Sequence, residues 1–109
     1  MKPTTTKLSD LERADLGDVD LVVNTTSLGL TGERFPSMDY AGSKRETVFF
    51  DLVPKADTDF LGSARRARRR VLDGTGMLLH QGAAAFELWT GHPAPIEVMR
   101  RALRSARGA

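Results

Sequence analysis

Three short apolar runs, each followed by polar residues or glycine, constrain the fold of this 109-residue chain most strongly. The runs lie at residues 19–24, 47–53 and 69–73, and the connections between them are too long for tight hairpins. Buried strands joined by crossovers are typical of parallel sheets covered by helices. The sequence therefore predicts an α/β fold in one domain, residues 1–109: a partial Rossmann-like (half doubly wound) parallel sheet of about three strands.

Helical patterns follow the second and third runs. Residues 58–67 are amphipathic. A helix is expected to follow Gly76 and to end at Gly91, because glycine is common just beyond helix C-termini. A last helix should include Pro95 in its first turn. Its apolar stripe comprises Ile96, Met99, Ala102 and Leu103. The sheet is thus expected to have flanking helices and two C-terminal helices.

The remaining segments carry weaker signals. Residues 8–17 are expected to form a short helix, since a serine and a glutamate near its start have the spacing of a capping box. Residues 25–46 are rich in Gly, Ser, Thr and Pro and are interpreted as a long loop with one helical turn near residues 38–42. Residues 1–7 are expected to be disordered.

The composition argues against several kinds of site. The chain has no cysteine and only two histidines, His80 and His92, without a carboxylate at zinc-like spacing, so no metal site is expected. No apolar run approaches the roughly 20 residues that a membrane-spanning helix needs. The N-terminus has no apolar signal core, so the cytoplasm is the expected location.

Basic residues are concentrated in the second half of the chain. Residues 57–109 carry 9 basic and 5 acidic side chains, against 7 and 9 in residues 1–56. Much of the excess is the arginine block at residues 65–70. Such a block can bind nucleic acid, but arginines at a helix C-terminus also favour the helix dipole. Because no aromatic residues are interleaved, we favour a solvated helix end and do not expect a nucleic-acid partner.

Special residues follow each expected strand. Asn24-Thr25-Thr26 ends the first and Asp51 lies near the end of the second. Since ligands bind beyond the carboxyl ends of parallel strands, these segments should line one edge. Asn24 and its threonines could bind an amide or phosphate group, but the residue types alone favour a turn cap. Asp51 and Asp73 are expected to bond loop amides, a structural role.

Gly74-Thr75-Gly76 follows the third strand and precedes a helix. A dinucleotide-binding loop would need a third small residue where Leu79 stands. We instead expect the glycines to let the backbone approach a flat ring at the helix N-terminus.

Within that helix, Gln81 is expected to lie buried among apolar neighbours. Its amide suits a sugar-like hydroxyl, although a bond to a neighbouring loop remains equally open. His80 is interpreted as a surface or interface residue. Phe86 and Trp89 are expected to be core residues rather than a ligand platform. No nucleophile and base pair is visible, so no catalytic residue is assigned.

Three segments together resemble the shikimate dehydrogenase family. They are residues 20–26 with Gly29, residues 48–53 with Thr58 and Leu61, and residues 73–91. The last segment is the most specific, and the resemblance extends over about residues 8–106.

The resemblance implies the NADPH-dependent reduction of 3-dehydroshikimate to shikimate in aromatic amino-acid biosynthesis. It implies that Gln81 hydrogen-bonds a hydroxyl of shikimate, and that Thr25 and Thr26 face the NADP cofactor. The residues that it places around the nicotinamide and its ribose are Leu52, Gly74 and Met77.

The sequence also departs from the family pattern. The family usually has a tyrosine just after the Asp-Leu-Val stretch, where this chain has Pro54. The family's catalytic lysine and aspartate, its pyrophosphate loop and its 2′-phosphate motif precede the matched segments. The chain is therefore expected to be truncated, to bind NADP weakly and to be inactive alone.

Three alternatives stay open. The chain could be the C-terminal part of a shikimate dehydrogenase that needs the missing N-terminal domain. It could be a self-associating module, because half a sheet has an unpaired edge and a homodimer could complete it. The third alternative is anion or nucleic-acid binding through residues 65–70. The residues do not distinguish shikimate from quinate as substrate.

Overall fold

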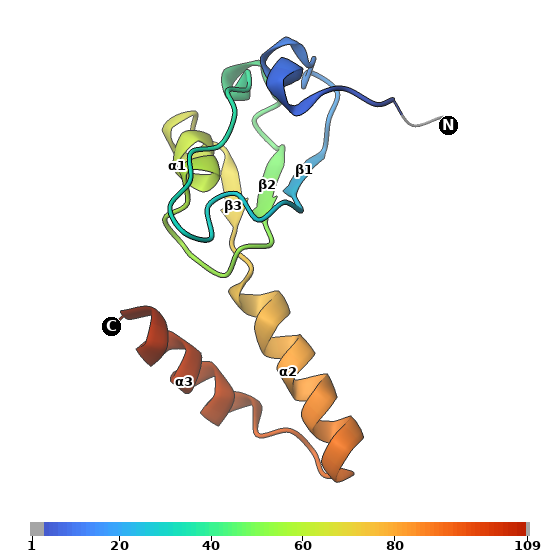
Figure 1. Cartoon of the computed structure of the whole chain (residues 1–109), viewed down its shortest axis with the longest axis vertical. Coiled ribbons are helices and arrows are strands. Elements are labelled where there is room, and N and C mark those ends of the chain that lie inside the picture. Colours follow the sequence, from blue (N-terminus) through green and yellow to red (C-terminus); the bar gives the residue numbers. More distant parts are fainter. Residues whose placement is uncertain (1–3, 109) are drawn as a thin grey trace.

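Three parallel strands form the centre of the fold in a computed structural model that describes residues 4–108 (Figure 1). The strands β1 (Leu21–Asn24), β2 (Val48–Asp51) and β3 (Arg70–Leu72) lie side by side in that order. Leu21 pairs with Val48, and Phe50 pairs with Leu72. The predicted α/β fold with three parallel strands is confirmed.

The helices begin and end close to the predicted residues. They are η1 (Leu8–Arg13), η2 (Tyr40–Gly42), α1 (Asp59–Arg66), α2 (Thr75–Thr90) and α3 (Ile96–Gly108). The Thr58 hydroxyl caps α1 by accepting a 3.2 Å hydrogen bond from the Leu61 amide. Gly91 ends α2 in the left-handed conformation, with φ of 69°, as its position predicted.

The N-terminal helix differs from its prediction. Only residues 8–13 are helical, as a 3-10 helix, and Ala14 is already extended. No side chain caps the start of η1, so the expected capping box is wrong. The predicted helical turn near residues 38–42 is confirmed as η2. Of the segment expected to be disordered, residues 1–3 lie outside the described residues and residues 4–7 have no regular secondary structure.

The core lies on one face of the sheet, between the strands and α1. Phe49 from β2 and Phe60 from α1 are almost fully buried, with ring centroids 5.8 Å apart. The other buried residues of this cluster are Leu16, Leu61 and Ala64. The inward spacing of the α1 residues, which the sequence predicted, is confirmed.

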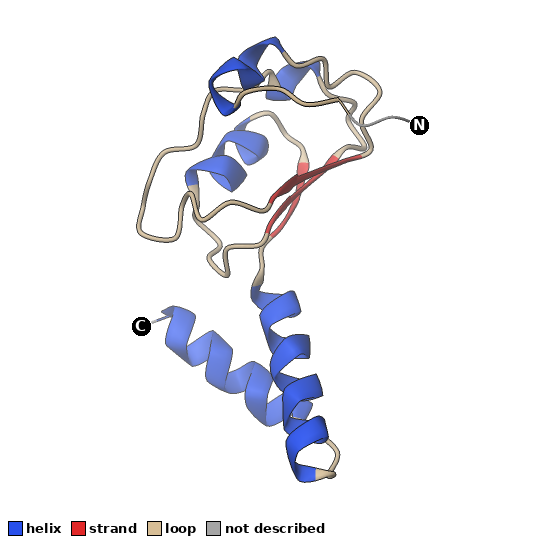
Figure 2. Ribbon diagram, turned by 45° about the vertical axis from the view of Figure 1, so that its right-hand side comes forward, coloured by secondary structure: helices blue, strands red, loops and turns tan. Residues whose placement is uncertain are grey.

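No described helix covers the other face of the sheet (Figure 2). Side chains alternate along a strand, so Leu21 and Val23 of β1 share this face with Leu72 of β3. They are 52%, 39% and 56% exposed. The prediction that these strands are buried is therefore wrong for this face, because the helices after β3 leave the sheet instead of folding back across it.

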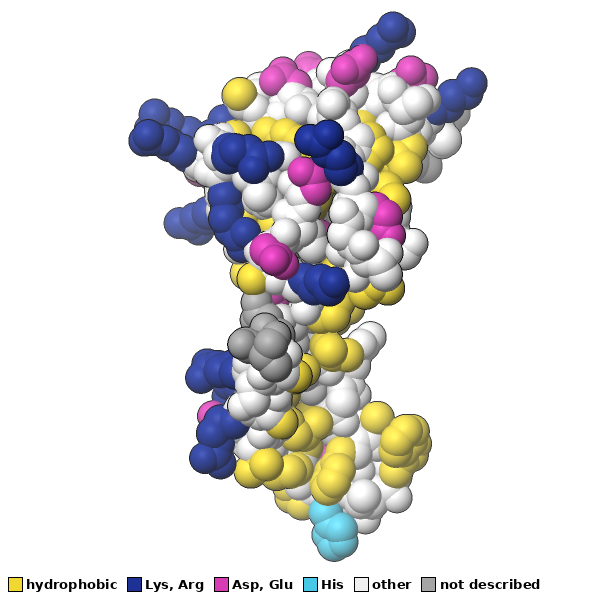
Figure 3. Space-filling model, turned by 60° about the vertical axis from the view of Figure 1, so that its left-hand side comes forward, with side chains coloured by type: hydrophobic (Ala, Val, Ile, Leu, Met, Phe, Trp, Pro, Cys, Tyr) yellow, Lys and Arg dark blue, Asp and Glu magenta, His cyan; other side chains and the backbone are white. Residues whose placement is uncertain are grey.

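Helices α2 and α3 form a hairpin that extends away from the sheet (Figure 1). Helix α3 packs against α2, where Met99 of its apolar stripe lies close to Gly82, while Ala102 of the same stripe is exposed. Trp89, expected in the core, is 82% exposed near the tip of the hairpin, whereas Phe86 is partly buried. Hydrophobic side chains gather over this hairpin in Figure 3. Among residues 4–108, no helix is long and apolar enough to cross a membrane.

The arginine block behaves as a solvated helix end. Arg65 and Arg66 end α1 and are exposed, and Arg68 beyond them is exposed with φ of 61°. Arg69 is the exception, because its guanidinium donates to the Ser43 hydroxyl at 2.8 Å and also to nearby backbone carbonyls. Arg69 therefore anchors the loop that precedes β2.

Candidate functional site

The segments that follow the three strands meet at one edge of the sheet, as the sequence predicted. The Leu52 amide donates to the Asn24 carbonyl at 3.1 Å, which joins the ends of β1 and β2. The Gly74 amide donates to the Val53 carbonyl at 3.1 Å, which joins the ends of β2 and β3. These bonds hold together the segments that follow the strands and place the candidate site at the carboxyl edge of the sheet.

Asp51 organises this edge from inside. Its carboxylate is fully buried and accepts hydrogen bonds from the Asn24 side-chain amide at 3.1 Å and from the Val53 amide at 3.0 Å. Its other oxygen accepts from the Thr58 hydroxyl at 2.7 Å. A buried carboxylate needs such donors to offset its lost hydration. The predicted structural role of Asp51 is confirmed, and its partners include two side chains besides a loop amide.

Asn24 caps the turn that carries the two threonines. Its side-chain oxygen accepts from the Thr26 amide at 3.0 Å and from the Thr26 hydroxyl at 2.6 Å. The Thr26 hydroxyl in turn accepts from the Leu28 amide at 3.1 Å. The turn-cap interpretation of Asn24 is therefore confirmed. Thr25 and Thr26 both lie exposed beyond β1.

The loop after this turn is held by Glu33. Its carboxylate accepts hydrogen bonds from the Gly29 amide at 3.1 Å and from both the amide and the hydroxyl of Thr31. The Thr31 hydroxyl and these backbone amides lower the pKa of Glu33 to about 2. Gly29 itself has φ of 105° and lies against Thr58, so the loop is tied to the first turn of α1.

Only glycine fits at position 74, because the backbone there lies against the backbone of the segment after β2. A Cβ at this position would lie 2.6 Å from the Leu52 carbonyl carbon and also too close to its oxygen. Gly76 differs, because a Cβ there would meet no atom within 4 Å. Only Gly76 is thus free to admit an external group, while Gly74 serves the packing of β3 against the segment after β2.

A cavity of about 370 Å³ lies beside Gly76 at the end of β3. Met77 of α2 lines it together with Phe50, Leu72 and Asp73. The Asp73 carboxylate accepts from the Thr75 amide at 2.8 Å, which confirms its expected bond to a loop amide and orders the turn into α2. Of the six residues that the sequence singled out for binding, Met77 alone lines this cavity.

The other five predicted binding residues do not line this cavity. Leu52 and Gly74 contact each other at the sheet edge, and the two threonines follow β1 at the far side of that edge. Gln81 lies one helical turn after Met77 on the same face of α2. It is exposed, so its predicted burial is wrong, because α2 projects away from the sheet. His80 is exposed, in agreement with its interpretation as a surface residue.

Two features of the site were missed from the sequence. The bond between Asn24 and Asp51 joins residues 27 positions apart, and only the strand register brings them together. The Glu33 contacts are local, and a carboxylate shortly after a Gly-Leu-Thr-Gly turn is a signal that could have indicated them. Among the residues that the structure describes, no group of three potential metal ligands occurs.

The sequence of this chain matches one protein-family model, which describes the shikimate 5'-dehydrogenase C-terminal domain and matches residues 74–104. The NADP(+)-dependent shikimate dehydrogenase of Methanothrix thermoacetophila is 40% identical over 102 residues. The match covers 94% of this chain and 36% of that protein. The chain thus spans about a third of the length of the curated relatives it matches.

Solved structures give the same result for the fold. A shikimate dehydrogenase in complex with NADP+ superposes with a TM-score of 0.74 at 31% identity, over 87% of this chain and 34% of that one. A quinate dehydrogenase from Corynebacterium glutamicum in complex with NAD gives 0.69 at 32% identity, over 82% of this chain and 32% of that one. In sequence and in fold, the chain corresponds to the C-terminal part of shikimate dehydrogenases.

Proposed function

We propose that this chain forms the C-terminal part of the NADP-binding domain of a shikimate dehydrogenase, which reduces 3-dehydroshikimate to shikimate with NADPH. The observation that carries the proposal is the meeting of three strand ends at one edge, since each end belongs to a segment that resembles the family. The similarity to NADP(+)-dependent shikimate dehydrogenases supports it over nearly the whole chain.

The cavity beside Gly76 fits the nicotinamide end of the cofactor. It is bounded by the apolar side chains of Phe50, Leu72 and Met77, and Gly76 leaves its backbone accessible. A flat ring stacks well against such a surface. When bound, the cofactor would supply the hydride for reduction of the carbonyl.

The remaining residues take supporting roles in this proposal. Thr25 and Thr26 face the cofactor from the end of β1, while Leu52 and Gly74 form the edge against which its ribose packs. Gln81 shares a face of α2 with Met77 and would donate to or accept from a substrate hydroxyl. Its exposure in this chain leaves the amide accessible for that bond.

We further propose that residues 1–109 alone bind NADP weakly and do not turn over substrate. Reduction of a carbonyl needs a proton donor within hydrogen-bond reach of the forming alkoxide. The titratable groups that line the cavity are Arg65 and Asp73. The Arg65 guanidinium donates to the Ala56 carbonyl, and Asp73 orders the turn into α2, so we assign neither as that donor.

NMR titration of the ¹⁵N-labelled chain with millimolar NADP+ tests the binding part of the proposal. We expect progressive shifts of the Gly76 and Met77 amides, with little change in the η1 amides. A Gly76→Leu variant should lose these shifts, because the new side chain would fill the cavity. If wild-type Gly76 and Met77 do not respond, or if both proteins respond equally, the proposed nicotinamide site is wrong.

One face of the sheet is left uncovered by the described helices. Leu21, Val23 and Leu72 form an apolar surface of the kind that parallel sheets bury. We propose that the part of the relatives that precedes the matched region covers it, whether in the same chain or supplied separately. The alternative is a second copy of this chain, and light scattering distinguishes the two: a concentration-dependent dimer would favour self-association.

A further inference from the structure

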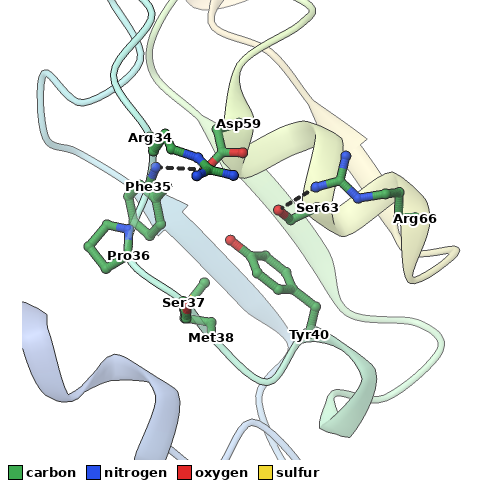
Figure 4. A pocket seen from close by; sticks show the side chains of 9 residues that line it. All are labelled: Arg34, Phe35, Pro36, Ser37, Met38, Tyr40, Asp59, Ser63 and Arg66. Atoms are coloured by element: carbon green, nitrogen blue, oxygen red, sulfur yellow. Dashed lines mark hydrogen bonds between the residues drawn. The ribbon is translucent and has the colours of Figure 1, made fainter.

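A separate cavity of about 510 Å³ lies between α1 and the loop that connects β1 to β2 (Figure 4). Its lining comes from loop residues 34–40 and from α1. It shares no lining residue with the cavity beside Gly76. Neither the resemblance nor the strand-end geometry assigns it a role, and its size lies within the usual range for small-molecule sites.

Aromatic side chains form one wall of this cavity. Phe35 and Tyr40 line it and are partly buried. Their rings pack against the core, since Phe35 lies 4.8 Å from the Phe60 ring and Tyr40 lies 5.2 Å from the Phe49 ring. Because the core holds both rings in place, they present a preformed flat surface to a ligand.

Two guanidinium groups border the same cavity. Arg34 comes from the loop and Arg66 from the last turn of α1, and neither forms an ion pair with any residue in the described part of the chain. Arg66 donates to the neutral Ser63 hydroxyl at 3.0 Å. The one acidic residue in the lining, Asp59, accepts from the Phe35 amide at 2.8 Å. The lining therefore carries a net positive charge of one unit, with both guanidiniums accessible.

Tyr40 adds a neutral hydroxyl to this arrangement. Burial raises the pKa of Tyr40 to about 12, so its phenol stays protonated at neutral pH. Figure 4 shows the Tyr40 hydroxyl directed toward the side of the cavity where Ser63 and Asp59 lie. A protonated phenol can donate a hydrogen bond to an anion without adding a charge.

We propose that this cavity is a binding site for a small carboxylate that carries a flat ring. The carboxylate group would lie between Arg34 and Arg66, because guanidinium groups bind carboxylates through paired, charge-assisted hydrogen bonds. The ring would stack against Phe35 and Tyr40. The site is independent of the proposed nicotinamide cavity, so either can fail without the other.

NMR titration of the ¹⁵N-labelled chain with sodium benzoate tests the proposal, at an ionic strength held constant with sodium chloride. We expect saturable shifts of the Phe35 and Ser63 amides. Sodium acetate, which has the carboxylate but no ring, should bind about tenfold more weakly or worse, because stacking on the two aromatic side chains is lost.

The double variant Arg34→Gln with Arg66→Gln should lower the benzoate affinity by about tenfold or more. Both side chains are exposed, so the variant should remain folded, as its spectrum will show. Arg101→Gln, an exposed arginine on α3, is the matched control and should bind benzoate as the unmodified chain does. Shifts that do not saturate, equal binding by the double variant, equal binding of acetate, or shifts centred on Gly76 would each overturn the proposal.

Discussion

The side-chain amide of Asn24 donates a 3.1 Å hydrogen bond to the buried carboxylate of Asp51. The two residues face each other as the last register pair of β1 and β2. Through them, the turn that carries Thr25 and Thr26 is coupled to the segment that carries Leu52. One buried polar pair therefore positions the candidate site. Substitutions in that pair should disturb both the turn after β1 and the segment after β2.

Replacing Asp51 with alanine should destabilise the chain by about 3 kcal/mol or more, because three donors lose their acceptor inside the protein. Urea unfolding followed by circular dichroism measures the change. Asp57→Ala is the control, since Asp57 is exposed, and it should shift the free energy of unfolding by less than about 0.5 kcal/mol. Similar values for the two variants would contradict the role of Asp51.

The two glycines before and within the first turn of α2 should respond in opposite ways to alanine. Gly74→Ala should cost about 1–3 kcal/mol or more, since its Cβ would overlap the Leu52 carbonyl. Gly76→Ala should be neutral or stabilising by up to about 1 kcal/mol, because its Cβ meets nothing and alanine favours the helix. Thermal unfolding of both variants checks this difference, and an equal loss in the two would refute it.

Thr58 has two structural roles that both depend on its hydroxyl. Its hydroxyl caps α1 and donates to Asp51, so Thr58→Val should destabilise the chain by about 1–3 kcal/mol while keeping its shape. Thr58→Ser keeps the hydroxyl and should lose clearly less. Equal unfolding free energies for the valine and serine variants would show that the hydroxyl does not contribute.

The Glu33 contacts make the loop around Gly29 sensitive to acid. The pKa of Glu33 is lowered from 4.5 to about 2 in the folded chain, so its contribution to stability is complete above about pH 4.5 and is lost as the pH falls toward 2. The Thr31 amide resonance should report this titration near pH 2. Glu33→Gln should abolish it. A midpoint near 4.5 in the unmodified chain would mean that the hydrogen bonds do not form in solution.

The exposed sheet face should matter for association rather than for the stability of this chain. Leu21→Lys should change the free energy of unfolding by less than about 0.5 kcal/mol, because this side chain is already more than half exposed and does not line the proposed nicotinamide cavity. It should weaken binding of a complementing segment by about tenfold, since burying an unpaired lysine is unfavourable. Unchanged binding of that segment, measured by calorimetry, would place its contact elsewhere.

Local patterns were sufficient to predict most of the fold. The β-branched run before Asn24, the α1 amphipathic pattern and the stop at Gly91 each depend on nearby residues, and all three were located correctly. The burial of β1 was predicted wrongly. Leu21 and Val23 are residue types that are typical of a core, and a sequence alone does not show what covers each face of a sheet. Trp89 was misplaced for the same reason.

The candidate site was predicted in outline but not in detail. The convergence of strand ends follows from parallel topology alone. The contact between Gly74 and Leu52, and that between Asn24 and Asp51, depend on register and on backbone approach, which residue types do not specify. The cavity beside Arg34 and Arg66 brings together a loop and a helix, and no sequence motif links these two arginines, which lie more than 30 positions apart.

The measurement that tests the central claim most directly is complementation in trans. Residues 1–109 would be mixed with the part of the Methanothrix thermoacetophila shikimate dehydrogenase that precedes its matched region. NADPH oxidation by 3-dehydroshikimate would then be followed by absorbance, with each part alone and with the Gln81→Ala variant as controls. We predict turnover only in the mixture, reduced at least about tenfold by Gln81→Ala. If a folded, associated mixture shows no turnover, or if Gln81→Ala leaves it unchanged, the proposed site is contradicted.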